Sequence, residues 1–312
     1  MKLYIKINTL KVLKNLDDLL PLSLSKTSIL LNNNSNVEYI TNIKCSYEIL
    51  EQQEKIFFDK REIKNLVKGI YFGNTQCEYL LPSFSEILEV KKICKTKHYN
   101  FVFALPPLSE FKLQEVREIL ELLNQEYTEI VVNDFGALQL ALEFENLKPI
   151  LGVNFTKIIK NAFIDSVKPD DISDDVLENQ KRLLSHCEFE QASVREFYKD
   201  LSVSRFSIEN IALNIDFIKN TPTMQCDFYY PNITIASSKA CDIAGLFDDK
   251  SRYFVQENCH KYCNQISLEF QHSKVLGLYQ RYISIYKINT KIELDEKLYK
   301  NAKNRFVWEV FI

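Results

Sequence analysis

Short apolar runs rich in aromatic and β-branched residues recur along the chain, and most end at Gly, Pro, Asn or Asp. Runs of this length and content are typical of buried strands. The first run differs, because apolar and basic residues alternate in it with a period of two, which predicts a strand with two different faces. The predicted strands are Met1–Ile7, Gly69–Gly73, Asn100–Leu105, Glu129–Asn133, Pro149–Asn154, Val203–Ser207, Asp227–Pro231 and Thr234–Ala236.

Between these runs the apolar residues follow the spacing of an amphipathic helix. The predicted helices are Leu10–Leu20, Tyr47–Val67, Phe84–Cys94, Ala137–Glu143, Asp174–Leu184, Gln191–Leu201 and Asn210–Lys219. Ser109 is expected to cap one more helix, whose apolar stripe runs from Leu113 to Leu123. Within the predicted helix Asn210–Lys219, the segment Ile211–Ile215 could instead be extended.

Strands separated by helix-sized segments predict a parallel sheet, because parallel strands need crossover connections. No G-x-G-x-x-G follows a strand and no phosphate-binding G-x-x-x-x-G-K-[ST] occurs, which favours a closed barrel over an open nucleotide-binding sheet. The sequence therefore predicts one α/β domain over residues 1–312, a (β/α)8-like TIM barrel that is complete, incomplete or distorted, with an insertion at residues 8–66.

Charge and hydropathy limit the classes of partner. The formal net charge of -3 gives no overall basic field, so DNA is not an expected partner. No run approaches the ~18 apolar residues of a membrane-spanning helix, and the N-terminus does not resemble a signal peptide. We therefore expect a cytoplasmic protein without a membrane span. In that compartment thiols stay reduced, so the eight cysteines indicate metal ligation or simple burial rather than disulfides.

The cysteines near the C-terminus carry the clearest chemical signal. Cys241, Cys259 and Cys263 form a C-x17-C-x3-C pattern, and Cys77 closely follows the predicted strand Gly69–Gly73. In a barrel the carboxyl ends of all strands open onto the same face, so a distant cysteine can join a cluster of three. Four thiolates at such a rim could hold an iron–sulfur cluster or a structural zinc.

Burial alone is the competing explanation for each cysteine, because free cysteine is among the most buried residue types. We assign Cys45, Cys94 and Cys187 to that class. Cys226, near the start of a predicted strand, is a spare that could replace one of the four proposed ligands.

Three segments of the chain resemble one known family. They are Ile70–Cys77, Val131–Ala137 and Cys241–Cys263, and they are similar to the collagenase-like peptidase family U32, above all to its ubiquinone-hydroxylation branch. The likeness extends over roughly residues 67–269. In that branch a strand ending in Y-[FL]-G-x-x-x-C supplies one cluster ligand, and a later cysteine group supplies three.

The resemblance implies a (β/α) barrel with a 4Fe–4S cluster held by Cys77, Cys241, Cys259 and Cys263. It also implies a role in oxygen-independent hydroxylation of an aromatic small molecule or an RNA base, and a heterodimer with a related subunit. The chain departs from the family in two places. Glu78 stands where a basic residue usually follows the first cysteine, and Lys239 replaces an Arg before the second.

Other polar residues are candidates for contact with a substrate. Asn133, Asp134 and Asn154 follow predicted strands, where barrel active sites form, although a helix cap or a polar strand end explains each equally well. Arg205 could meet an anion or pair with a carboxylate on a neighbouring strand.

Hydrolase motifs such as G-x-S-x-G and H-E-x-x-H are absent. Two hypotheses therefore lead: a redox protein with a cluster, and a non-catalytic scaffold whose cysteines hold zinc or nothing. A peptidase, as the family name suggests, comes third.

Overall fold

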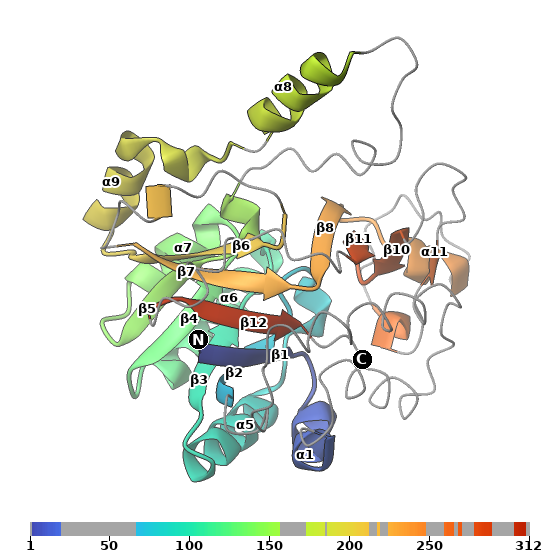
Figure 1. Ribbon diagram of the computed structural model, residues 1–312. Coiled ribbons are helices and arrows are strands. Elements are labelled where there is room, and N and C mark those ends of the chain that lie inside the picture. The colour runs from blue at the N-terminus through green and yellow to red at the C-terminus, as the bar shows by residue number, and fades with distance from the viewer. Residues whose placement is uncertain are drawn as a thin grey trace.

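A closed barrel of parallel strands forms the body of the molecule (Figure 1). The computed structural model describes residues 2–19, 67–156, 173–184, 186–211, 217–218, 224–247, 259–264, 268–269, 278–288 and 303–309. Around the barrel the strands follow the order β1-β2-β3-β4-β5-β6-β7-β12, and every neighbouring pair is parallel. The barrel strands are β1 (Lys2–Ile7), β2 (Val67–Gly73), β3 (Asn100–Ala104), β4 (Thr128–Val132), β5 (Leu147–Leu151), β6 (Arg205–Glu209), β7 (Gln225–Tyr230) and β12 (Arg305–Glu309).

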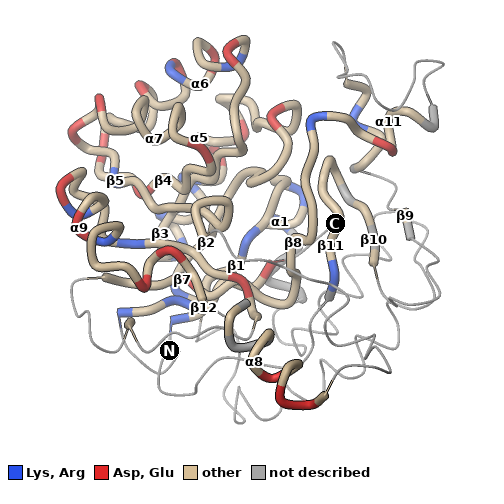
Figure 2. Tube along the Cα trace, turned by 90° about the horizontal axis from the view of Figure 1, so that it is seen from above, with Lys and Arg blue, Asp and Glu red and all other residues tan. Residues whose placement is uncertain are grey.

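Helices alternate with the strands and cover the outside of the barrel, so the predicted (β/α)8-like fold is confirmed. The helices are α1 (Leu10–Leu19), α5 (Phe84–Thr96), α6 (Glu110–Leu123), α7 (Phe135–Leu142), α8 (Asp174–Leu184), α9 (Ala192–Asp200) and α11 (Asp242–Phe247). Short 3-10 turns are η1 (Glu78–Leu80), η2 (Val153–Phe155), η3 (Glu188–Glu190) and η4 (Tyr262–Asn264). Acidic and basic positions are interspersed along the helices (Figure 2). No helix among these has the length and apolar content to cross a membrane.

A second sheet is inserted between the seventh and eighth barrel strands. It is antiparallel, in the order β8 (Asn232–Ser237), β11 (Ser284–Ile288), β10 (Leu278–Arg281) and β9 (Leu268–Glu269). Figure 1 shows this sheet and α11 beyond the carboxyl ends of the barrel strands. Strands β9 to β12, including the strand that closes the barrel, were not predicted from the sequence.

The barrel strands have two distinct faces. Their outward side chains pack with the helices in the main apolar core, to which Phe72, Phe103 and Phe228 belong. Their inward side chains form a smaller apolar layer of Tyr4, Tyr71, Val102, Ala104, Val131, Ile150, Tyr229 and Val307, with Val153 of η2 beside it. Period-two alternation of this kind is what a closed, side-chain-filled barrel requires.

Several predicted boundaries need correction or lie outside the described residues. Ser109 is the residue before α6, but its side chain makes no capping hydrogen bond there. The predicted helix Tyr47–Val67 lies outside the described residues except for Val67, which begins β2. The predicted helix Asn210–Lys219 also falls partly outside them.

Candidate functional site: four cysteines beyond the barrel

Three of the four predicted ligand cysteines lie in one small apolar cluster. Cys77 and Cys263 are buried and Cys241 is partly buried, and they pack with Leu80, Ile243 and Tyr282. Cys259 is partly exposed, but its thiol lies near enough to Cys77 and Cys241 to raise the pKa of both. The fold therefore gathers all four positions, from the loop after β2 and from the segment around the second sheet.

The loop that carries Cys77 is held in place from both ends. The Asn74 side-chain oxygen accepts hydrogen bonds from the backbone N–H groups of Gln76 (2.8 Å) and Cys77 (2.7 Å). The Gln76 side-chain oxygen accepts hydrogen bonds at 3.1 Å from the hydroxyls of Ser237 on β8 and Ser284 on β11. These contacts join the barrel loop to the second sheet, which brings Cys77 to the other cysteines.

Glu78 and Lys239, the two departures from the resembled family, contact each other. Lys239 Nζ lies 3.3 Å from Glu78 Oε1, and Glu78 Oε2 accepts the Ser109 N–H at 2.6 Å. Burial alone would raise the pKa of Glu78, but the bonds from Ser109 and Lys239 hold it below its usual value. Ser109, expected to cap a helix, is thus engaged by the residue after Cys77.

The thiols are poor ligands until a metal replaces their protons. Burial raises the pKa of Cys77 to about 12, and it also raises the pKa of Cys241. Backbone N–H groups face three of the sulfurs: that of Tyr79 faces Cys77, those of Ile243 and Ala244 face Cys241, and that of Lys261 faces Cys259. Such N–H groups stabilise a thiolate once it has formed.

The donor set suits a soft metal or an iron–sulfur cluster, because thiolates are the ligands these centres prefer. Within the described ranges, however, no three His, Cys, Asp or Glu side chains already stand in an arrangement that could hold a metal ion. Metal binding would thus draw the thiols toward a common centre.

The spare ligand Cys226 does not belong to this site. It lies fully buried on the helix-facing side of β7, and its N–H donates to Asn304 Oδ1 at 3.0 Å. Cys94 on α5 and Cys187 are buried in the same core, as expected for cysteines without a special role. Cys45 lies outside the described residues.

The polar candidates on the barrel mostly have structural partners. Asp134 caps α7, accepting from the Ala137 N–H at 2.7 Å, and its other oxygen accepts from the Leu108 N–H at 2.6 Å. Asn133 donates to the Leu105 carbonyl at 2.7 Å, while its buried side-chain oxygen has no hydrogen-bond partner among the residues that the structure describes. Asn154 lies exposed in η2.

Arg205 is placed at the opposite end of the barrel from the cysteines. It begins β6, and its guanidinium lies 2.6 Å from Asp227 Oδ1 on β7. Of the two alternatives for this residue, the ion pair with a neighbouring strand is the one the structure contains.

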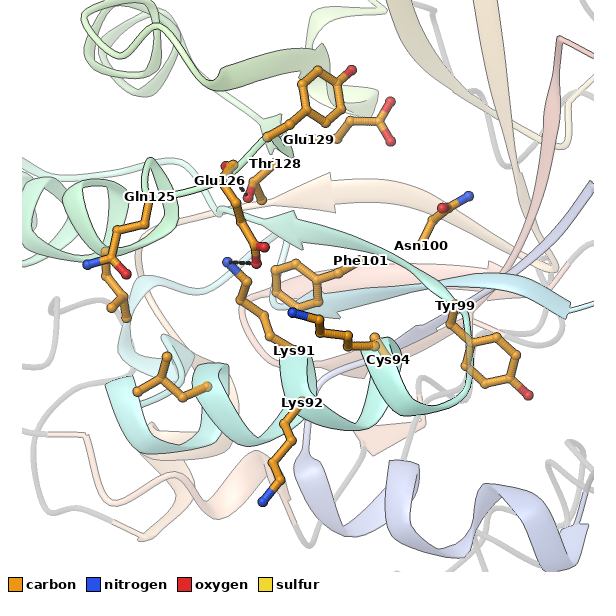
Figure 3. A pocket seen from close by; sticks show the side chains of 14 residues that line it. Lys91, Lys92, Cys94, Tyr99, Asn100, Phe101, Gln125, Glu126, Thr128 and Glu129 are labelled. Carbon is orange, nitrogen blue, oxygen red and sulfur yellow. Dashed lines mark hydrogen bonds and ion pairs between the residues drawn. The ribbon is translucent and has the colours of Figure 1, made fainter.

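A pocket of about 600 Å³ also lies at the amino end of the barrel, beside α5 and the residues before β3 and β4. Figure 3 shows Lys91 and Glu126 facing each other across it, and their side chains lie 2.7 Å apart. This pocket has no residue in common with the cysteine site.

Sequence reasoning missed a buried polar group at the carboxyl end of the barrel. Strand β6 ends at Glu209 and strand β12 at Glu309, and Lys6 is the last residue but one of β1. All three side chains are buried. Their signal was a charged residue at an inward position of an otherwise apolar strand.

Comparisons with protein-family models, with curated proteins and with solved structures find no match. The resemblance to the peptidase family therefore stays a prediction.

Replacing Gly73 with alanine should disturb the loop that presents Cys77. Gly73 has a φ of +123°, and an added Cβ would lie 2.4 Å from the Ala104 carbonyl oxygen on the neighbouring strand. We expect a loss of about 1–3 kcal/mol in the free energy of unfolding, measured with urea. Gly136→Ala within α7 is the matched control, and it should cost less, because its φ is ordinary and the added Cβ would lie 3.1 Å from Asp134 Oδ1 rather than against backbone. Equal stability of the two variants would contradict the argument.

Proposed function

We propose that the protein is an iron–sulfur protein whose 4Fe–4S cluster is held by Cys77, Cys241, Cys259 and Cys263. The observation that carries the proposal is the meeting of Cys77, at one apolar site beyond the barrel, with three cysteines that follow it by more than 160 positions in the sequence. Apolar surroundings and backbone N–H groups near the sulfurs are the features that set the potential of such a cluster.

Its proposed role is electron transfer in the oxygen-independent hydroxylation of an aromatic ring or an RNA base. Four cysteine ligands leave no iron open to a substrate, which favours redox work over Lewis-acid catalysis. The choice of reaction rests on the resemblance described above, as does the expectation of a heterodimer with a related subunit. The paired Glu78 and Lys239 distinguish the surroundings of the site from the pattern of that family.

Anaerobic purification followed by an absorption spectrum and analysis of iron and sulfide tests the cluster. We expect a brown protein with a broad visible band and about four iron and four sulfide per chain. Cys259→Ala should lose the band, since it removes one ligand. Cys226→Ala should retain it, because that cysteine faces the helices.

Three results would be decisive against the proposal. A colourless protein with one zinc per chain would support a structural zinc site and the scaffold hypothesis. A folded protein without metal under strict anaerobic conditions would leave the barrel fold as the one feature that this chain shares with the resembled family. Loss of the band in Cys226→Ala but not in Cys259→Ala would mean that the ligand set is wrong.

A further inference from the structure

The pocket at the amino end of the barrel has the size of a small-molecule site. Its volume of about 600 Å³ falls within the ~300–1,000 Å³ that is usual for ligand pockets. Side chains of α5 and of the connection between α6 and β4 line it, together with the first residues of β3 and β4. Apolar, aromatic and charged side chains occur in this lining (Figure 3), so the pocket suits a ligand with both an apolar and a charged part.

An ion pair crosses this pocket. Lys91 Nζ on α5 lies 2.7 Å from Oε1 of Glu126, which follows α6. The two partners differ in exposure, because the Lys91 side chain is 14% exposed and the Glu126 side chain 59%. The Glu126 carboxylate can therefore turn into water at little cost. Lys91 is largely shielded from water and needs an anion in its place, because a shielded charge is stable only with a partner.

Positive charge exceeds negative charge around this ion pair. Lys95 also lines the pocket, one helical turn after Lys91 on the same face of α5. The hydrogen bond and charge of Lys91 lower the pKa of Glu126, and the charge of Lys95 adds to this. Lys92 follows Lys91 directly, and its side chain extends from α5 away from Glu126 (Figure 3). Two ammonium groups thus act on one carboxylate that a ligand can displace.

The second carboxylate of the lining, Glu129, is already neutralised. Both of its oxygens accept hydrogen bonds from Arg305 at 2.7 Å. Glu129 therefore does not cancel the charge of the two lysines, and their excess suits a ligand group with close to two negative charges.

An aromatic surface adjoins the Lys91 ammonium. Its Nζ lies 5.9 Å from the centre of the Phe101 ring, and Figure 3 shows the two side chains next to each other. Phe101 packs against the main core and is only partly buried. Leu88 and Tyr127, also in the lining, are 51% and 67% exposed. A ligand held at Lys91 by an anionic group would cover these apolar surfaces with its remaining part.

We propose that this pocket binds an aromatic phosphate monoester, the chemical class to which nucleoside monophosphates belong. The phosphate takes the place of the Glu126 carboxylate at Lys91 and also faces Lys95, and the aromatic ring lies against Phe101. A phosphate monoester carries about −1.5 to −2 charges near neutral pH, which matches the two lysines. The pocket has no residue in common with the cysteine site, and the inference is independent of the proposed function.

Equilibrium dialysis with radiolabelled adenosine 5′-monophosphate, adenosine and inorganic phosphate tests the site. We expect the monophosphate to bind about tenfold more tightly, or better, than either of the other two probes, because it occupies both the charged and the aromatic part of the pocket. Phe101→Leu should bring the affinity for the monophosphate close to that for inorganic phosphate, since it removes the ring and keeps an apolar side chain.

Variants of the two ion-pair partners should change the affinity for the monophosphate in opposite directions. Lys91→Gln should weaken binding about tenfold or more, since it removes a charged hydrogen-bond donor. Glu126→Gln should strengthen binding by up to about fivefold, because the phosphate no longer displaces a carboxylate. Lys112→Gln is the control, because Lys112 pairs with Glu115 on α6 outside the pocket, and the affinity should not change. Poor folding cannot produce a gain of affinity, so the Glu126 variant keeps the test valid if Lys91→Gln is unstable.

The outcomes decide both parts of the proposal. A loss of affinity in Lys91→Gln together with a gain in Glu126→Gln would support it. Absence of binding at millimolar monophosphate would overturn it. Equal affinities for the monophosphate and inorganic phosphate would mean an anion site without an aromatic part, and equal affinities for the monophosphate and adenosine would mean that the lysines do not bind the phosphate. Either result would overturn the proposed class of ligand. Weaker binding in both ion-pair variants would mean that the pair only supports the shape of the pocket.

Discussion

Asp227→Ala should lower the free energy of unfolding by about 3–5 kcal/mol, the range found when one partner of a buried ion pair is removed. Asp227 is fully buried inside the barrel. It accepts hydrogen bonds from Arg205 Nη1 at 2.6 Å and from the Tyr71 hydroxyl. Without this carboxylate, Arg205 keeps only Glu129, 3.9 Å from its Nε, as an ionic partner among the described residues.

The hydrogen bonds around Asp227 explain why neighbouring side chains cannot easily replace its carboxylate. Arg305 donates to both oxygens of Glu129 at 2.7 Å and to the Tyr71 hydroxyl at 3.0 Å. These groups lie at the amino end of the barrel, so a missing carboxylate leaves a void and leaves Arg205 with only the more distant Glu129 as an ionic partner among the described residues.

Urea unfolding near neutral pH measures the effect. Glu143→Ala is the matched control, because it removes a carboxylate from an exposed pair with Arg117 at 2.7 Å. Exposed pairs contribute about 0–1 kcal/mol, so this variant should stay close to the wild type. Similar losses in the two variants would mean that the buried network contributes no more than a surface ion pair.

Much of the barrel could be predicted from the sequence because its inner strands carry a strong local signal. Asn100–Leu105 and Glu129–Asn133 are apolar runs flanked by helical patterns, and they correspond to β3 and β4 within a residue or two. The closing strand Arg305–Glu309 carries a charge at each end and follows a long insertion. Phe306-Val307-Trp308 is nevertheless a strand-like apolar run, so this strand could also have been predicted from its local pattern.

A repeated pattern in the sequence could have located the charged layers inside the barrel. β6 reads Arg-Phe-Ser-Ile-Glu and β12 reads Arg-Phe-Val-Trp-Glu. In both strands the Arg lies at the amino end and the Glu at the carboxyl end of the inward face, while Phe206 and Phe306 point to the helices. Because the side-chain period of a strand is two, the spacing of four places both charges on the same face.

The two-residue period of side chains along a strand also explains why the position of Cys226 could not be predicted from the sequence. Cys226 and Asp227 are neighbours on β7, so they point to opposite faces, and only the structure shows that the aspartate takes the inward one. Cys77, by contrast, follows a strand end in any barrel of this topology. Its meeting with Cys241 and Cys263 depends on the second sheet, which the sequence analysis did not predict.

Metal loading of the cysteine site should weaken by about a hundredfold or more for each unit by which the pH is lowered. A thiol binds metal as a thiolate, so each protonated ligand must release a proton and contributes about a factor of ten per pH unit. The raised pKa values of Cys77, about 12, and of Cys241 mean that both thiols are protonated near neutral pH.

Anaerobic titration of the metal-free protein with Co²⁺ measures this dependence, since cobalt–thiolate bonds absorb visible light. Cys226→Ala should give the same slope as the wild type, because Cys226 lies in the core between barrel and helices. Cys77→Ala should both weaken binding and reduce the slope by about one proton per metal. A slope clearly below a hundredfold in the wild type would contradict this expectation, since it would mean that Cys77 and Cys241 do not both release a proton when the metal binds. A slope of a hundredfold or more would link the burial of these thiols directly to the pH range in which the site can be filled.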